Sequence, residues 1–377
     1  MINLKNFNWG PGLFLIIYQL LFLIGLPIYL YYNTPSLALI VCSLVLFFLT
    51  GISITGGYHR YYSHRCYKLS KPAEAVILFF ATMAGQGSVL RWAYDHRIHH
   101  AFVDTDKDPY SIKKGFWYAH FLWILEKPKG IESKVVPDLL ENPMVVFQEK
   151  YIGTAMFLTN LAAFFILGWS LNDYLGAFVL ALWGRLFLLH HATWFINSLA
   201  HTWGDKPFSQ EQSAVNNYLI SLVTFGEGYH NYHHTFCNDY RNGIKWYHFD
   251  PTKWMIWTLH KLGLASNLKK VDDVIINKRI ILEHKRLLLE RLNKMWSTRK
   301  DELEGKVNEL AEQLLEKLSR ANDLKRRFHA YRRQCIPQEI LQELRSDLAG
   351  LSQSLKDDFN SWWSLSKDIM KMKPQLA

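Results

Sequence analysis

Clusters of histidine are the feature of this sequence best suited to chemistry. Three clusters occur: His59 and His64 in HRYYSH, His96, His99 and His100 in HRIHH, and His230, His233 and His234 in HNYHH. Imidazole nitrogens bind iron, zinc, copper or nickel, so the residue type alone does not name the metal. Eight histidines are more than one ion can use, and their number therefore predicts a site for two metal ions.

The spacing within each cluster indicates how the imidazoles are presented. Residues three and four positions apart share one face of a helix, so His96 is expected beside His99 and His100. The third cluster repeats this spacing. His59 and His64 are five residues apart, which suits a helix end that unwinds toward the site.

Long apolar stretches must position these clusters. Four of them can cross about 30 Å of hydrocarbon: Leu13–Tyr32, Leu37–Gly56, Tyr151–Trp169 and Tyr174–Ile196. The short connections Asn33–Ser36 and Ser170–Asp173 make two helical hairpins, and neither connection carries Lys or Arg. The positive-inside rule then places both termini and all three histidine clusters in the cytoplasm.

Two further apolar stretches are shorter. Ala73–Leu90 is interrupted by Gly85, Gln86 and Gly87, and a fifth crossing there would separate the first two histidine clusters across the membrane. We therefore expect a buried or interfacial helix at Ala73–Leu90, and a similar interfacial segment at Phe116–Leu125.

From Val271 onward the sequence is rich in Lys, Arg, Glu, Leu and Gln and is predicted to be helical. A four-three alternation of apolar residues runs through Leu303, Val307, Leu310, Leu314, Ala321, Leu324, Phe328 and Tyr331. This pattern is typical of a coiled-coil seam or of the buried face of a long helical hairpin, which Pro337 is expected to end. Self-association, partner binding and a solvated extension are all open for this tail.

Composition agrees with a membrane setting. The formal net charge is +10, which suits either nucleic acid or an anionic membrane surface, but 14 Trp residues favour the second and no nucleic-acid motif supports the first. We expect an all-α integral membrane protein with four transmembrane helices in two hairpins. A cytoplasmic helical cap carries the histidines within residues 1–270, and a coiled-coil-like cytoplasmic tail follows at 271–377.

The remaining histidines differ in their surroundings. His201, in NSLAH just past the fourth stretch, is a ninth candidate ligand, whereas His190 and His191 lie within that stretch and are open to packing or function. The others are interpreted as packing or surface residues: His120, His248, His260, His284 and His329. Carboxylates often orient ligand imidazoles, and the candidates, each equally open to being solvated, are Asp95, Asp104, Asp106 and Glu227.

The histidine set and its flanking segments resemble the membrane fatty acid desaturases, specifically the stearoyl-CoA (delta-9) type. The segments are RWAYDHRIHHAFVDTDKDPYS, TWFINSLAHTWGDKPF, GEGYHNYHHTFCNDYRNG and WYHFDPTKW. The resemblance runs from about Leu13 to Val271 and does not cover the tail. It implies two irons held by His59, His64, His96, His99, His100, His201, His230, His233 and His234, with Asn197 reaching a metal through water.

The resemblance also implies a substrate tunnel. Phe47 matches the position at the tunnel floor, Gly51 a wall position, and Gln86 and Trp92 the bend that places the reacting carbons. Asp95 is retained, but Tyr94 stands where an Arg usually helps to hold coenzyme A. Gly87 likewise replaces a polar contact, and Lys127 and Lys129 are candidates to bind phosphate instead.

The activity implied is insertion of a cis double bond, at the delta-9 position, into a saturated long-chain acyl-CoA or acyl-lipid, with O₂ as oxidant. The sequence has no heme-binding HPGG segment and no flavin motif. The electrons are therefore expected from a separate donor of the cytochrome b5, ferredoxin or rubredoxin type. Two alternatives stay open: a di-iron hydroxylase of lipid or sterol on the same scaffold, and a membrane metal-binding scaffold whose tail binds a partner.

Overall fold

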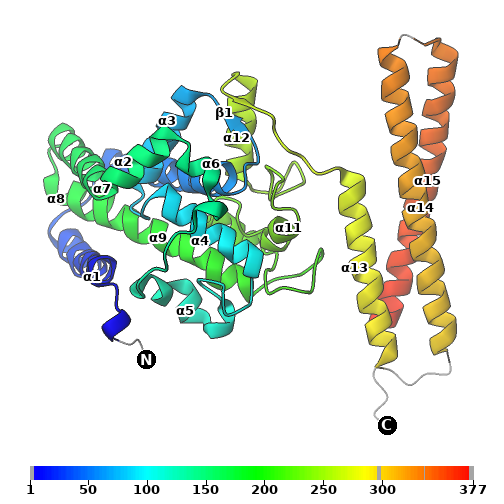
Figure 1. Cartoon of the computed structure of the whole chain (residues 1–377), viewed down its shortest axis with the longest axis horizontal. Coiled ribbons are helices and arrows are strands. Elements are labelled where there is room, and N and C mark those ends of the chain that lie inside the picture. Colours follow the sequence, from blue (N-terminus) through cyan, green and yellow to red (C-terminus); the bar gives the residue numbers. More distant parts are fainter. Residues whose placement is uncertain (1–3, 295–298, 335, 373–377) are drawn as a thin grey trace. The chain divides into compact units, whose positions relative to one another are not determined.

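The computed structural model describes residues 4–294, 299–334 and 336–372. The chain forms two compact units (Figure 1). The first combines Met1–Lys206 with Glu211–Lys270, and the second combines Pro207–Gln210 with Val271–Ala377. Apart from one pair of two-residue antiparallel strands, β1 (Lys68–Leu69) and β2 (Ala265–Ser266), the regular elements in the described residues are helical.

Four helices among the described residues are long and apolar enough to cross a membrane. They run over Trp9–Tyr32 (α1), Leu37–Ser63 (α2 to Ser53, then a π-helical continuation), Pro143–Ser170 (α7) and Tyr174–His201 (α8, a π-helical segment, α9 and a final 3₁₀ turn). The predicted number and order are confirmed. The third helix begins at Pro143, before the predicted Tyr151, and it is kinked at Tyr151, where φ is −117° and ψ is 17°.

The two hairpin connections are fixed by capping. Ser36 accepts a hydrogen bond from the backbone N–H of Leu39 at 3.1 Å, and Asp173 accepts one from Gly176 at 2.7 Å. The Tyr29 hydroxyl also donates to Asp173 at 2.6 Å, so the end of α1 is tied to the start of the fourth helix. The first three of these membrane helices all contact the π-helical segment of the fourth, Ala177–Gly184.

The stretch Ala73–Leu90 is not one helix. Helix α3 (Lys71–Met83) ends before a bend, and α4 (Val89–Phe102) begins after it. Gly85 and Gly87 in the bend have φ angles of +70° and +80°, a region that favours glycine. The single helix that we expected is therefore broken at the residues that interrupt the apolar run.

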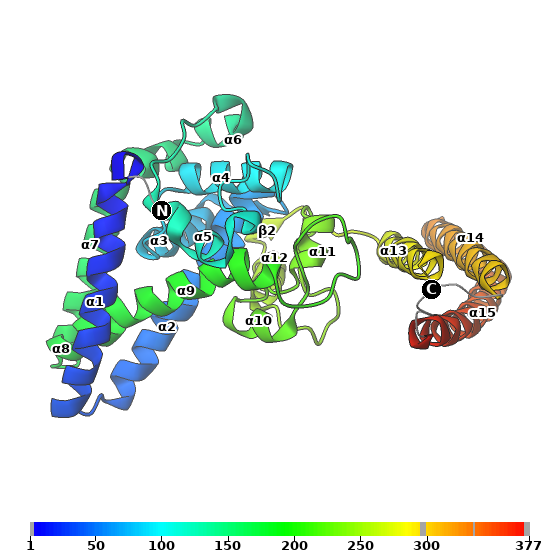
Figure 2. The same cartoon turned by 90° about the horizontal axis from the view of Figure 1, so that it is seen from below.

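The remaining elements of the first unit are short. They comprise α5 (Phe116–His120), α6 (Pro137–Leu140), α10 (Tyr218–Val223), α11 (His230–Thr235), α12 (Pro251–Lys261) and 3₁₀ turns at Leu4–Asn6, Ile112–Lys114, Leu122–Leu125 and Ser133–Val135. Figure 2 shows α1, α2 and α7 extending to one side of this unit, away from α4, α11 and α12. We call the part of the first unit outside the four long helices the cap.

The second unit is a bundle of α13 (Asp273–Asn293), α14 (Lys300–Arg333) and α15 (Gln338–Lys371). The apolar alternation lies on the buried side of α14, where Leu303, Val307 and Leu314 pack with Leu288 of α13 and Trp362 of α15. This is the packing of a long helical hairpin joined by α13. Helix α14 ends at Arg333, and Pro337 directly precedes α15.

Candidate metal centre

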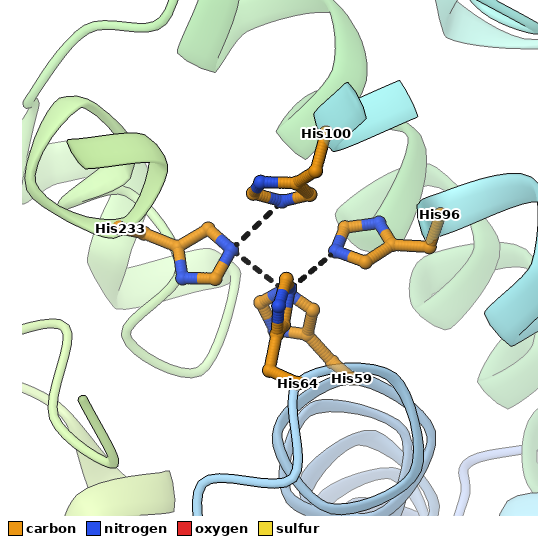
Figure 3. A group of neighbouring side chains, drawn as sticks. All are labelled: His59, His64, His96, His100 and His233. Atoms are coloured by element: carbon orange, nitrogen blue, oxygen red, sulfur yellow. Dashed lines mark hydrogen bonds between the residues drawn. The ribbon is translucent and has the colours of Figure 1, made fainter. Parts of the chain in front are cut away.

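Nine histidines meet in two groups inside the first unit. The groups are His59, His64, His96, His100 and His233, shown in Figure 3, and His99, His201, His230 and His234. Within each group one ring nitrogen per residue lies within 4.8 Å of all the others. Every histidine predicted as a metal ligand is in one of these groups, which agrees with the expectation of two metal ions.

Local helix geometry explains the spacing of the first cluster. His59 lies in the π-helical segment Ile54–Ser63, and His64 caps that segment with its backbone N–H 3.1 Å from the carbonyl of His59. A π-helix closes its hydrogen bonds five residues apart, so both rings reach the same site. The wider turn, rather than an unwound helix end, brings this pair together.

Each of the other two clusters is divided between the groups. On α4, His96 and His100 face the first group while His99 faces the second. On α11, His230 and His234 face the second group, whereas His233 faces the first. Residues four apart therefore stay together, and both helices serve both sites.

The Nε2 atoms converge at the centre of each group. In the first, Nε2 of His233 lies 3.0 Å from that of His59 and 3.1 Å from that of His100. In the second, Nε2 of His230 lies 3.1 Å from those of His201 and His234.

In two of the rings Nδ1 points outward to a carboxylate. Nδ1 of His59 is 2.9 Å from Glu227, and Nδ1 of His99 is 2.9 Å from Asp108. A carboxylate can only accept, so in these rings Nδ1 carries the proton and Nε2 presents a lone pair inward. Each group therefore presents at least one inward lone pair, which is the donor that a metal ion requires.

Burial favours the neutral, metal-binding form of six of these imidazoles. It lowers the pKa of six histidines well below the usual value, and neighbouring histidines lower it further: His64, His96, His100, His230, His233 and His234. The donor set is therefore ready for a metal at neutral pH.

A buried ionic network supports His59. Burial alone would raise the pKa of the Glu227 carboxyl, but Arg60 and His59 outweigh burial and lower it. Arg60 donates to Glu227 at 2.8 Å and to Asp250 at 3.0 Å, and all three side chains are almost fully buried. Asn242 donates to the second oxygen of Glu227 at 2.6 Å.

The proposed orienting carboxylates are only partly those expected. Glu227 contacts a histidine directly, and Asp104 does so through Ser213, whose hydroxyl lies 2.6 Å from both Asp104 and His201. Asp95 instead pairs with Arg91 at 2.6 Å. Sequence reasoning missed Asp108, although it lies in the same DTDKD segment as Asp104.

A cavity of about 650 Å³ opens beside the first group. His59 and His96 line it together with most of the residues expected at the substrate, namely Gln86, Trp92, Asp95 and Lys127. Asn197, which was expected to reach a metal through water, also lines the cavity. Gln86 donates to Thr193 at 2.8 Å. Phe47 and Gly51 are not among the described residues that line the cavity. The ring of Phe47 packs against Phe225, and Gly51 lies so close to Phe225 that an added Cβ atom would overlap its ring.

The family model for fatty acid desaturases matches residues 34–265, which include all nine histidines. The chain belongs to the fatty acid desaturase family.

Relatives agree with this assignment. A probable acyl-CoA desaturase of Schizosaccharomyces pombe is 42% identical over 288 residues, 74% of this chain and 60% of the relative. Acyl-CoA desaturase 1 of Saccharomyces cerevisiae is 39% identical over 248 residues, 65% of this chain and 49% of the relative. Stearoyl-CoA desaturase 5 of Bos taurus is 36% identical over 247 residues, 62% of this chain and 72% of the relative.

This member of the family spans 60% and 49% of the length of the two yeast proteins. Its four apolar helices make it an integral membrane protein. The all-imidazole donor set fits the iron of an iron-dependent enzyme of this family.

Two histidines within the fourth membrane helix have other partners. Nε2 of His190 lies 2.9 Å from the carbonyl of Ala84, and its Nδ1 lies 2.7 Å from the hydroxyl of Tyr18. His190 therefore holds the start of the glycine bend that carries Gln86. His191 instead faces His120, with 3.1 Å between Nδ1 and Nε2.

Proposed function

We propose that this protein introduces a cis double bond, at the delta-9 position, into saturated long-chain acyl-CoA at a di-iron centre. The observation that carries the proposal is the pair of histidine groups, one of which opens on a cavity of about 650 Å³ through His59 and His96. The balanced reaction joins one saturated acyl chain, O₂, two electrons and two protons. It yields one unsaturated chain and two waters.

The nine histidines are the proposed iron ligands, five in the first group and four in the second. Asn197 lines the cavity and is proposed to reach a metal ion through water. When bound, the irons supply the oxygen chemistry that an unactivated C–H bond requires. The chain itself holds the imidazoles, orients those of His59 and His99 through Nδ1, and favours the neutral form of six others by burial.

The cavity supplies positioning and excludes water. Ile54, Trp92 and Ile98 give apolar contacts beside the metal ligands. The bend at Gln86 is fixed from both sides, by Thr193 and by His190. A flexible acyl chain held in one conformation presents the same pair of carbons to the irons in each turnover, which supports a single double-bond position.

Coenzyme A is the proposed acyl carrier, because the outer part of the cavity is basic. Lys107, Lys114 and Lys129 are exposed there, and Lys127 lies beside them with its ammonium 2.9 Å from the carbonyl of Lys5. The positive ammonium groups attract the phosphates of coenzyme A. They are proposed to replace the usual Arg, which is Tyr94 in this chain.

The electron donor is proposed to be a separate protein, and the histidine groups and both termini are proposed to be cytoplasmic. The lack of Lys and Arg in both hairpin connections supports that orientation. We also propose residues 1–270 as the catalytic domain and 271–377 as a separate helical domain.

Expression in a host that lacks its own desaturase tests the function. Mass spectrometry of the host lipids is expected to find a new monounsaturated acyl chain with the wild type and with His329→Ala, a control on the exposed side of α14. His99→Ala and His233→Ala are expected to insert in the membrane but to give no product. A hydroxylated acyl chain without a new double bond would instead favour the hydroxylase alternative, and unchanged lipids the scaffold.

A further inference from the structure

Phe225 lies behind the inner wall of the acyl cavity. The outer part of the cavity carries exposed lysines, whereas its inner wall consists of buried residues that include Ile54, Thr55 and Glu227. Phe225 packs with Ile54 in one buried cluster and is only two residues before Glu227. An acyl chain that enters past the lysines and passes His59 therefore meets this wall.

The Phe225 ring fills the space beyond the wall. Its centroid lies 5.3 Å from that of Phe47 and 5.8 Å from that of Phe48. A Cβ atom added to Gly51 would overlap the same ring. Phe225 thus separates the cavity from the two α2 positions that the family resemblance assigns to the substrate tunnel.

The cap holds this ring in place. Phe225 has a φ angle of +56°, which is rare for an aromatic residue and requires support from its surroundings. Thr252 of α12 donates to the carbonyl of Phe225 at 2.9 Å and lies 2.6 Å from the hydroxyl of Thr55. A Cβ at the next residue, Gly226, would overlap Asp250, so the backbone is tightly packed against the start of α12.

We propose that Phe225 closes the inner end of the acyl cavity and so limits the length of the acyl chain that the enzyme desaturates. This inference rests on the proposed function. It assigns chain-length selection to a residue of the cap rather than to the membrane helices alone. Removing the ring joins the cavity to the space beside Gly51 and Phe47, whereas crowding the ring at Gly51 pushes it toward the cavity.

Competition between palmitoyl, stearoyl and arachidoyl chains tests the proposal in the desaturase-deficient host. Phe225→Ala is expected to raise the ratio of longer to shorter unsaturated products about tenfold, because a few methylenes in an apolar pocket change selectivity by that order. Gly51→Ala is expected to shift the ratio toward shorter chains. Phe48→Ala is the matched control, since Phe48 touches the same ring but is 44% exposed on the membrane side.

A binding measurement tests the proposal even if a variant loses its activity. Equilibrium binding of the same three acyl-CoA thioesters to purified, unreduced protein is expected to show the same shift for Phe225→Ala, and a smaller one for Phe225→Leu. Unchanged product and binding ratios in both variants, or an equal shift in Phe48→Ala, would overturn the proposal. So would loss of both product and binding in the two Phe225 variants, because the ring would then serve only packing. A wild type that makes no unsaturated product is a different result and contradicts the proposed function itself.

Discussion

Nδ1 of His59 lies 2.9 Å from a carboxylate oxygen of Glu227. The two residues are far apart in the sequence, since Arg60, the neighbour of His59, is 167 positions away from Glu227. The contact fixes the tautomer of the imidazole and directs Nε2 to the centre of the first histidine group. Glu227 is itself held by Arg60 and Asn242. Orientation of the first metal ligand therefore depends on residues from distant parts of the chain.

Glu227→Gln is expected to weaken iron binding roughly 10- to 100-fold, because the neutral amide stabilises the His59 ring less well. Iron retained per chain, measured by elemental analysis after dialysis against a chelator, checks this. Glu302→Gln on the exposed surface of α14 is the control. Full iron retention in the Glu227 variant would show that the carboxylate is not needed to orient His59.

Arg60→Met is expected to destabilise the protein by about 3–5 kcal/mol, because it leaves Glu227 and Asp250 buried without their shared cation. Arg65→Met is a matched control, since Arg65 pairs with Asp138 at 3.0 Å but is 56% exposed. The control is expected to lose about 1 kcal/mol or less. Thermal unfolding in detergent measures both, and equal losses would contradict the importance of the buried network.

One histidine from each group tests the number of metal ions. His64→Ala is expected to lose iron from the first group and His201→Ala from the second, while each variant keeps the other site partly loaded. Iron content per chain and the Mössbauer spectrum distinguish the two sites. A wild type that saturates at a single ion would be inconsistent with two sites.

Deleting residues 271–377 is expected to leave the oligomeric state unchanged, because α13 and α15 of the same chain cover the apolar side of α14. Light scattering of the detergent-solubilised protein before and after the deletion checks this. If the mass of the particle fell to half of the value expected after subtracting the deleted residues, the tail would be responsible for self-association.

The sequence predicted the elements whose signal is local. Four apolar stretches, and histidines spaced by three, four and five residues, need only neighbouring positions to be recognised. The sequence could not predict that His99 joins the second group and His233 the first, because this depends on how α4 and α11 face each other. Arg60, Asp108 and Phe225 were missed because their roles arise from contacts made by distant segments.

The bend at Gly85–Gly87 shows the same limit. The glycines were visible as an interruption, but the anchor of the bend, His190, acts across 106 residues through the Ala84 carbonyl. The apolar alternation in the tail likewise fitted either a coiled-coil seam or a helical hairpin. Tertiary contacts decide which helices cover α14.

The most direct test of the di-iron desaturase is the mass of an acyl chain after a single turnover. Iron-loaded, chemically reduced protein is mixed with stearoyl-CoA and O₂, and the recovered chain is measured by mass spectrometry. A chain lighter by two hydrogen atoms, formed only with iron, is the predicted result. A chain heavier by one oxygen atom, or an unchanged chain with both metal sites loaded, would contradict it.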